Sequence, residues 1–136
     1  MCQVDHGPEI TLRSPAMVWR VQRQVAHSRI LLPVWEHNFD GSKASCRLGN
    51  RKPSPWPINT MVKAKGYDEG LGFMAFVSKR EAQKYTQSFF FFRPPIVIIP
   101  AEIPSGSRVQ FGEILSDVII GCGRPTLRTD QIILRP

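Results

Sequence analysis

The sequence is poor in the side chains from which metal sites and many catalytic sites are built. Its 136 residues include three cysteines and three histidines. The cysteines are far apart and form no CxxC pair, which excludes a disulfide framework and a zinc site of the usual spacing; they are Cys2, Cys46 and Cys122. Scattered cysteines of this kind suit a reducing compartment. The histidines show no HExxH spacing; they are His6, His27 and His37.

Long hydrophobic runs are also absent. The longest apolar stretch joins Phe89–Phe92 to Ile96–Ile99, and Arg93, Pro94 and Pro95 interrupt it. A membrane-spanning helix needs about 20 predominantly apolar residues. We therefore expect no membrane span.

No arrangement of residues predicts catalysis. Gly70-Leu71-Gly72 and Gly121-Cys122-Gly123 are isolated Gly-x-Gly pairs, and neither opens a helix after a strand as a phosphate-binding loop does. Cys122 has no histidine in its half of the chain to activate it, so we expect a small buried residue rather than a nucleophile. We predict a protein that is not an enzyme and has no cofactor, metal or small-molecule substrate.

Positive charge is concentrated in the first half of the chain. Residues 1–66 hold ten Lys/Arg and four Asp/Glu, a net of +6, whereas residues 67–136 hold eight and seven, a net of +1. All three tryptophans, Trp19, Trp35 and Trp56, lie in the basic half. This asymmetry favours a polyanionic partner, of which nucleic acid is the commonest. The alternative is a solvated basic surface that keeps the protein soluble.

These differences predict two parts. Residues 1–66 form a basic, largely irregular extension, and residues 67–136 form a small β domain. Prolines interrupt the extension at positions 8, 15, 33, 53, 55 and 57. A segment that buries little apolar surface does not offset its chain entropy, so we expect the extension to become ordered only against a partner.

One helix is expected within the extension, near residues 15–32. Ser14 and Pro15 suit an N-cap and a first helical position, and Pro33 would end the helix. Apolar and basic residues alternate by three and four positions: Val18, Val21 and Val25 on one face, Arg20, Arg23 and His27 on the other. Three interpretations stay open: a helix lying on phosphates, a mitochondrial targeting segment, and an ordinary surface helix.

Residues 38–57 are a loop by composition, with turn dipeptides and a proline cluster around Trp56. An extended backbone would present four cations to phosphate, namely Lys43, Arg47, Arg51 and Lys52. Trp56 is a candidate for stacking on a base or filling a protein groove.

The second half is predicted to be mainly β. Short runs rich in Val, Ile and Phe alternate with Pro, Gly and Ser, which favours a small sheet or a β-barrel-like domain. One segment has two interpretations. Ser78–Glu81 fits a capping box, so Lys79–Thr86 is either a helical turn or part of a hairpin.

Residues 73–134 resemble the bacterial-type large-subunit ribosomal protein twenty-one family, in its mitochondrial form. GFMAFVSKREAQKYT is similar to the family's first strand and turn, with Gln83 and Tyr85 near its Gln-Tyr pair. IPSGSRVQFGEIL is similar to its middle segment, GRPTL to its late motif, and Gln131–Leu134 to the strand that follows. Lys84 separates Gln83 from Tyr85, and the sequence ends where the family continues into a basic hairpin. The resemblance therefore implies a divergent, truncated member whose basic extension replaces that hairpin.

The resemblance implies a structural protein of the mitochondrial large ribosomal subunit, serving translation as part of a ribonucleoprotein, with ribosomal RNA and other ribosomal proteins as partners. A plastid location is the alternative. By position it also implies four RNA contacts, Lys79, Arg80, Lys84 and Arg124. The residues themselves add six more, Arg20, Arg23, Lys43, Arg47, Arg51 and Lys52. A second hypothesis is a non-catalytic accessory subunit of another organellar complex, held by protein–protein contacts.

Overall fold

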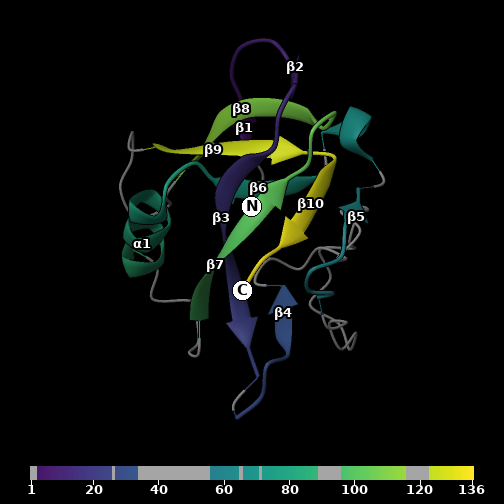
Figure 1. Ribbon diagram of the computed structural model, residues 1–136. Helices are drawn as coiled ribbons and strands as arrows, with labels where there is room; N and C mark the ends of the chain where they lie inside the picture. The colour runs from purple at the N-terminus through teal and green to yellow at the C-terminus, as the bar shows by residue number, and fades with distance from the viewer. Residues whose placement is uncertain are drawn as a thin grey trace.

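The computed structural model describes residues 3–25, 27–33, 56–64, 66–70, 72–88, 96–115 and 123–136. Within them, the chain forms strands, one short 3₁₀ helix and one α-helix (Figure 1). The elements in chain order are β1 (Val4–Asp5), β2 (Ile10–Thr11), β3 (Ala16–Gln24), β4 (Leu31–Pro33), β5 (Val62–Lys63), η1 (Tyr67–Glu69), β6 (Phe73–Phe76), α1 (Lys79–Ser88), β7 (Ile96–Ile103), β8 (Arg108–Leu115), β9 (Gly123–Thr129) and β10 (Gln131–Leu134).

The prediction of a mainly β protein is confirmed. The strands form one antiparallel sheet in the order β1-β8-β9-β6-β3-β7-β10-β5, with β2 also on β8 and β4 also on β3. This sheet does not close on itself. The strand expected at Gln131–Leu134 is β10.

The helix expected near residues 15–32 is wrong, because Ala16–Gln24 forms strand β3. Eight consecutive residues of β3 pair with β7, from Ala16 opposite Ile103 to Arg23 opposite Ile96. Val18 and Val21, two of the valines that suggested a helical face, lie on opposite faces of the sheet, since side chains alternate along a strand. Val18 belongs to one buried cluster and Val21 to another.

The first half of the chain supplies part of the core, so the prediction that it has no packing of its own is wrong for its described residues. Val18, Leu31 and Trp56 are buried in the same cluster as Phe73 and Leu134. The sheet therefore runs across the expected boundary at residue 66, with β3 lying between β6 and β7.

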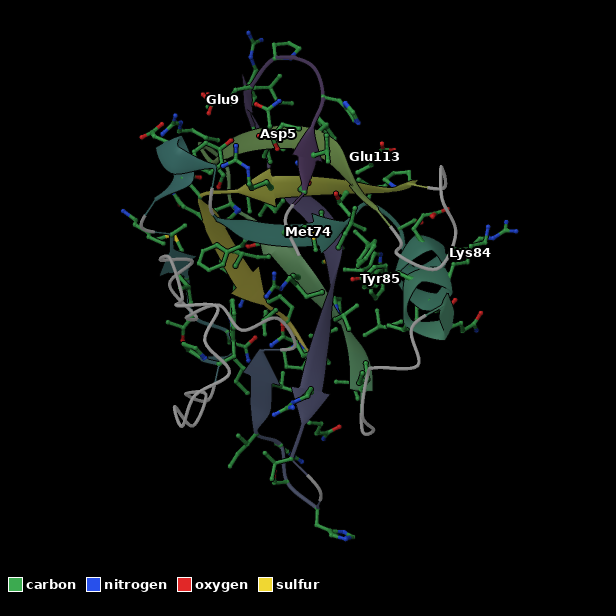
Figure 2. All side chains as sticks on the ribbon, turned by 180° about the vertical axis from the view of Figure 1, so that it is seen from behind. Asp5, Glu9, Met74, Lys84, Tyr85 and Glu113 are labelled. Atoms are coloured by element: carbon green, nitrogen blue, oxygen red, sulfur yellow. The ribbon has the colours of Figure 1, made fainter. Side chains whose placement is uncertain are left out.

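Helix α1 covers the other face of the sheet. Ala82 and Tyr85 from α1 are buried against Val21, Met74 and Phe76. Figure 2 shows Tyr85 on the side of α1 that faces the sheet and Lys84 on the opposite side. Tyr85 and Phe76 pack with their ring centroids 5.1 Å apart. The helix interpretation of this segment is therefore confirmed and the hairpin interpretation is wrong.

The start of α1 follows from a side-chain cap. The backbone N–H of Glu81 donates to the Ser78 Oγ at 3.2 Å, which satisfies one of the free donors of the first turn. Gln83 and Tyr85 consequently lie on a helix. Of the strand and turn expected at GFMAFVSKREAQKYT from the family resemblance, the strand forms as β6, and helix α1 stands where the turn was expected.

The N-terminal segment Gln3–Thr11, here called the strap, lies along the outer edge of β8. Val4 and Asp5 pair with Glu113 and Gly112, and Ile10 and Thr11 pair with Val109 and Arg108. Figure 1 shows the strap passing over β8 at the top of the sheet. In the described part of the chain, no helix is long and apolar enough to cross a membrane.

The strap requires glycine at position 112. A Cβ added to Gly112 would lie well inside contact distance of the Val4 carbonyl oxygen and of the Gln3 side chain. These are backbone and packed atoms of the strap, so the strap has to move to make room.

We predict that Gly112→Ala displaces the strap and lowers the free energy of unfolding by about 1–3 kcal/mol, the usual cost of overpacking. Val4→Ala is the matched control: it trims an exposed side chain of β1 and leaves the backbone pairing intact. Urea denaturation measures both. Equal stability of Gly112→Ala and the unmodified protein would show that β1 does not approach β8 as described.

Candidate nucleic-acid interface

The RNA contact predicted at Arg20 is wrong, because the Arg20 side chain is 4 % exposed. Its Nη1 donates to the Met74 carbonyl oxygen, and its Nε donates to the Gln22 Oε1 at 3.3 Å. Its guanidinium lies 4.8 Å from the Trp56 ring centroid. Burial lowers the pKa of Arg20 to about 9, which leaves it charged at neutral pH. Arg20 therefore joins β3 to β6 and the loop before β5, and does not face a phosphate.

Trp56 is also part of the core. It is 4 % exposed and packs edge-on against Phe73, with ring centroids 5.5 Å apart and an interplanar angle of 71°. An indole enclosed in this way cannot stack on a base, so the expected nucleic-acid role of Trp56 is wrong.

Two predicted contacts, Lys79 and Arg80, are exposed in the first turn of α1. Cations at this end of a helix oppose the macrodipole, at a cost of roughly 0.3–1 kcal/mol each when exposed. For Lys79, a cation–π contact with the Trp19 ring partly offsets this cost. The ring centroid lies 5.5 Å from the Lys79 Nζ. Arg80 has no side-chain hydrogen bond or ion pair with any residue in the described ranges. Helix stability therefore does not explain why a cation stands at position 80.

The remaining predicted contacts have different outcomes. Lys84 is half-buried on α1, and Arg23 is exposed near the end of β3. Lys43, Arg47, Arg51 and Lys52 lie outside the described residues. Arg124 lies in β9, and its side chain is not among those described.

Arg29 is an exposed cation that the sequence prediction missed. It lies in the turn between β3 and β4, two residues after His27, which is also exposed. The signal is present in the sequence: a basic residue follows His27-Ser28 in a stretch with no acid between Arg13 and Trp35. The expectation of a helix near residues 15–32 places Arg29 inside that helix, so the exposed turn that presents Arg29 is not foreseen.

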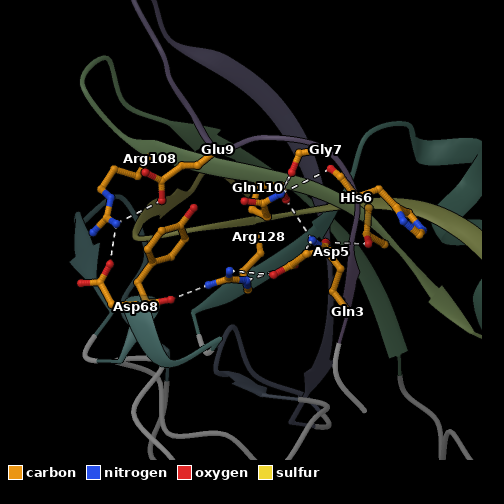
Figure 3. A network of polar contacts seen from close by, with 11 residues as sticks. Gln3, Asp5, His6, Gly7, Glu9, Asp68, Arg108, Gln110 and Arg128 are labelled. Atoms are coloured by element: carbon orange, nitrogen blue, oxygen red, sulfur yellow. Dashed lines mark hydrogen bonds and ion pairs between the residues drawn. The ribbon is translucent and has the colours of Figure 1, made fainter.

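Arg108 of β8 and Arg128 of β9 are engaged by acids of the strap and of η1 (Figure 3). Arg108 Nη2 lies 3.1 Å from the Glu9 Oε1 and also pairs with Asp68. Arg128 Nη2 lies 2.9 Å from the Asp5 Oδ2, and its Nη1 donates to the Tyr67 carbonyl oxygen. These cations hold the strap and η1 on the sheet.

The titration of this network follows from its pairing. The hydrogen bond from Arg108 lowers the pKa of Asp68, and the hydrogen bonds to Asp68 and Glu9 raise the pKa of Arg108. Burial of the Tyr67 ring raises its pKa to about 12, with the Glu9 carboxylate adding to the effect. All three groups keep their usual charge at neutral pH, so the network is intact there.

No family model, curated protein or solved structure matches the chain. Within the described residues, no group of three or more His, Cys, Asp or Glu side chains is placed to hold a metal ion.

The contrast between Arg20 and Arg23 gives a prediction about stability. Arg20→Ala leaves the Met74 carbonyl without its buried donor, so we expect a loss of at least about 1–3 kcal/mol in the free energy of unfolding. Arg23→Ala, three residues along the same strand, removes an exposed side chain and should change stability by no more than about 0.5 kcal/mol. Thermal or urea unfolding compares the two. Equal effects would contradict the burial of Arg20.

Proposed function

We propose that this protein is a non-catalytic RNA-contacting component of a larger assembly. One observation carries the proposal: charge is segregated over the described residues. Asp5, Glu9 and Asp68 pair with arginines of β8 and β9, and Glu102 pairs with Arg135. The exposed cations of α1, of the end of β3 and of the β3–β4 turn have no acid within ion-pair distance in the same described set; they are Lys79 and Arg80, Arg23, and Arg29.

The position of these cations supports a partner rather than solvent alone. Lys79 and Arg80 stand at the helix end that least favours positive charge. Like charges that are not neutralised internally also repel one another, and a polyanion removes that repulsion. Figure 2 shows the acids Asp5, Glu9 and Glu113 gathered at the strap, away from Lys84 on α1.

For the assembly, we propose the large ribosomal subunit of a mitochondrion, with ribosomal RNA and neighbouring ribosomal proteins as partners and a plastid as the alternative location. Its support is the family resemblance over residues 73–134. Within it, IPSGSRVQFGEIL spans the end of β7, a tight turn and all of β8, and GRPTL begins β9. The helix at Lys79–Ser88 departs from the family arrangement and weighs against the ribosomal part of the proposal.

The second candidate is a protein-binding accessory subunit. It is favoured by large apolar side chains that the described structure leaves exposed, among them Met17 at 56 % and Phe111 at 43 %. Phosphate contacts would be absent in that case, and the exposed cations would have no binding role.

Salt dependence of RNA binding tests the proposal. We expect the protein to bind RNA at low salt, with log K falling linearly against log salt. Charge reversal at Lys79→Glu and Arg80→Glu should weaken binding and reduce the slope by roughly 0.7–0.9 for each phosphate that is no longer neutralised. Arg13→Glu with Lys63→Glu is the matched control, because it makes the same charge change at exposed residues elsewhere in the fold.

Two results would contradict parts of this proposal separately. Absence of RNA binding by the unmodified protein at low salt rejects the RNA-contacting role. Sedimentation of the tagged protein tests the assembly: we expect co-migration with large ribosomal subunits that is abolished by nuclease treatment. Co-migration with a membrane complex, insensitive to nuclease, rejects the ribosomal assignment and favours the accessory subunit.

A further inference from the structure

The turn between β3 and β4 forms a hairpin that extends beyond the sheet. Among the described residues, the pairing of β3 with β7 extends as far as Arg23 opposite Ile96, and the pairing of β3 with β4 extends to Gln24 opposite Leu31. Beyond that point the two arms of the hairpin hydrogen-bond only to each other among the described residues. Figure 1 shows the hairpin projecting below the other strands.

The tip of the hairpin, described at Val25 and at His27–Ile30, is closed by its own hydrogen bonds. The Val25 N–H donates to the Ile30 carbonyl at 2.9 Å, and the Ser28 N–H donates to the Val25 carbonyl at 3.1 Å. Gln24 Nε2 donates to the Ser28 carbonyl at 2.8 Å. His27 occupies the left-handed region at φ 59, a conformation for which histidine is enriched. The tip is thus shaped before any partner arrives, which lowers the entropy cost of binding.

The base of the hairpin is fixed to the core. Leu31 is 4 % exposed, and the Trp56 N–H donates to its carbonyl oxygen at 2.7 Å. Trp56 in turn packs on Phe73 and lies beside Arg20. The base of the hairpin is therefore held to the core by a backbone hydrogen bond and by the burial of Leu31.

The exposed surface of the hairpin is basic and apolar, and its aromatic character is limited to the imidazole of His27. Arg23, His27 and Arg29 are exposed, as are Val25 at 37 % and Ile30 at 44 %. Residues 22–33 contain no Phe, Tyr or Trp and no acid. Single-stranded RNA is bound mainly by stacking successive bases on several aromatic side chains, and the hairpin offers only the single imidazole of His27 for this.

A two-stranded ribbon is the size of element that enters a wide nucleic-acid groove. In A-form RNA the wide, shallow groove is the minor groove, which presents 2′-hydroxyls and is bordered by phosphates. We propose that the β3–β4 hairpin docks in the minor groove of double-stranded RNA, with Arg23 and Arg29 contacting phosphates. Val25 and Ile30 then lie against the shallow floor of the groove. This inference rests on the proposed RNA-contacting function and assigns the form of RNA and the element that meets it.

The test measures binding of the full chain to an RNA duplex of about 16 base pairs, the span that double-stranded RNA-binding modules cover, and to a single strand of the same length. We expect the duplex to bind more tightly. Arg23→Glu with Arg29→Glu should weaken duplex binding by roughly tenfold or more at about 0.1 M salt. Arg23→Gln with Arg29→Gln should weaken it less, and unchanged melting temperatures of both variants show that the fold persists.

The outcomes separate this inference from the proposed function. If the hairpin variants bind duplex like the unmodified protein while Lys79→Glu with Arg80→Glu abolishes binding, the hairpin assignment is overturned and the RNA-contacting role stands. Tighter binding to the single strand than to the duplex also overturns it. If the unmodified protein binds neither RNA but binds poly-glutamate, both proposals fall, and the hairpin is a site for an acidic protein.

Discussion

The antiparallel pairing of β3 with β7 joins the two halves of the chain, and the rest of the described structure depends on it. Eight successive residue pairs align Ala16–Arg23 with Ile96–Ile103. The pairing sets the two faces of β3, so that Val18 enters the cluster around Phe73 and Val21 enters the cluster beneath α1. Burial of a valine side chain contributes about 1.5–3 kcal/mol. Without β3 both clusters would lose a buried member, and β6 would have no partner on one side.

Arginine has three separate roles in this fold, and its surroundings decide which one applies. Arg20 is enclosed and serves as a buried donor between β3 and β6. Arg108 and Arg128 are surrounded by acids and a tyrosine ring, so they hold the strap and η1 on the sheet. Arg23 and Arg29 are exposed and form no ion pair within the described chain. Net charge alone does not distinguish these roles; the strand and face on which each arginine lies do.

Sequence patterns predict the β-rich second half because its Val, Ile and Phe runs are short and separated by turn residues. They also give the start of α1 as one of two interpretations, since Ser78 and Glu81 stand at cap spacing. The same patterns are wrong for Ala16–Gln24. There Ser14-Pro15 resembles a helix start, Pro33 resembles a helix end, and the valines stand three and four residues apart as on one face of a helix. The strand forms because the extended chain buries Val18 in one cluster and Val21 in the other. The stabilisation comes from residues far along the chain, so the local sequence pattern does not reveal it. For the same reason the sequence alone places Arg20 and Trp56 on the surface.

Native-state hydrogen exchange of the β3 backbone amides tests the central role of this strand most directly. We expect the amides of Val18–Gln22 to exchange only through global unfolding, with a free energy of exchange equal to the free energy of unfolding and the same dependence on denaturant. Rapid exchange of these amides in a chain whose β8–β9 amides remain protected would contradict this account, because it would show that the sheet is stable without β3.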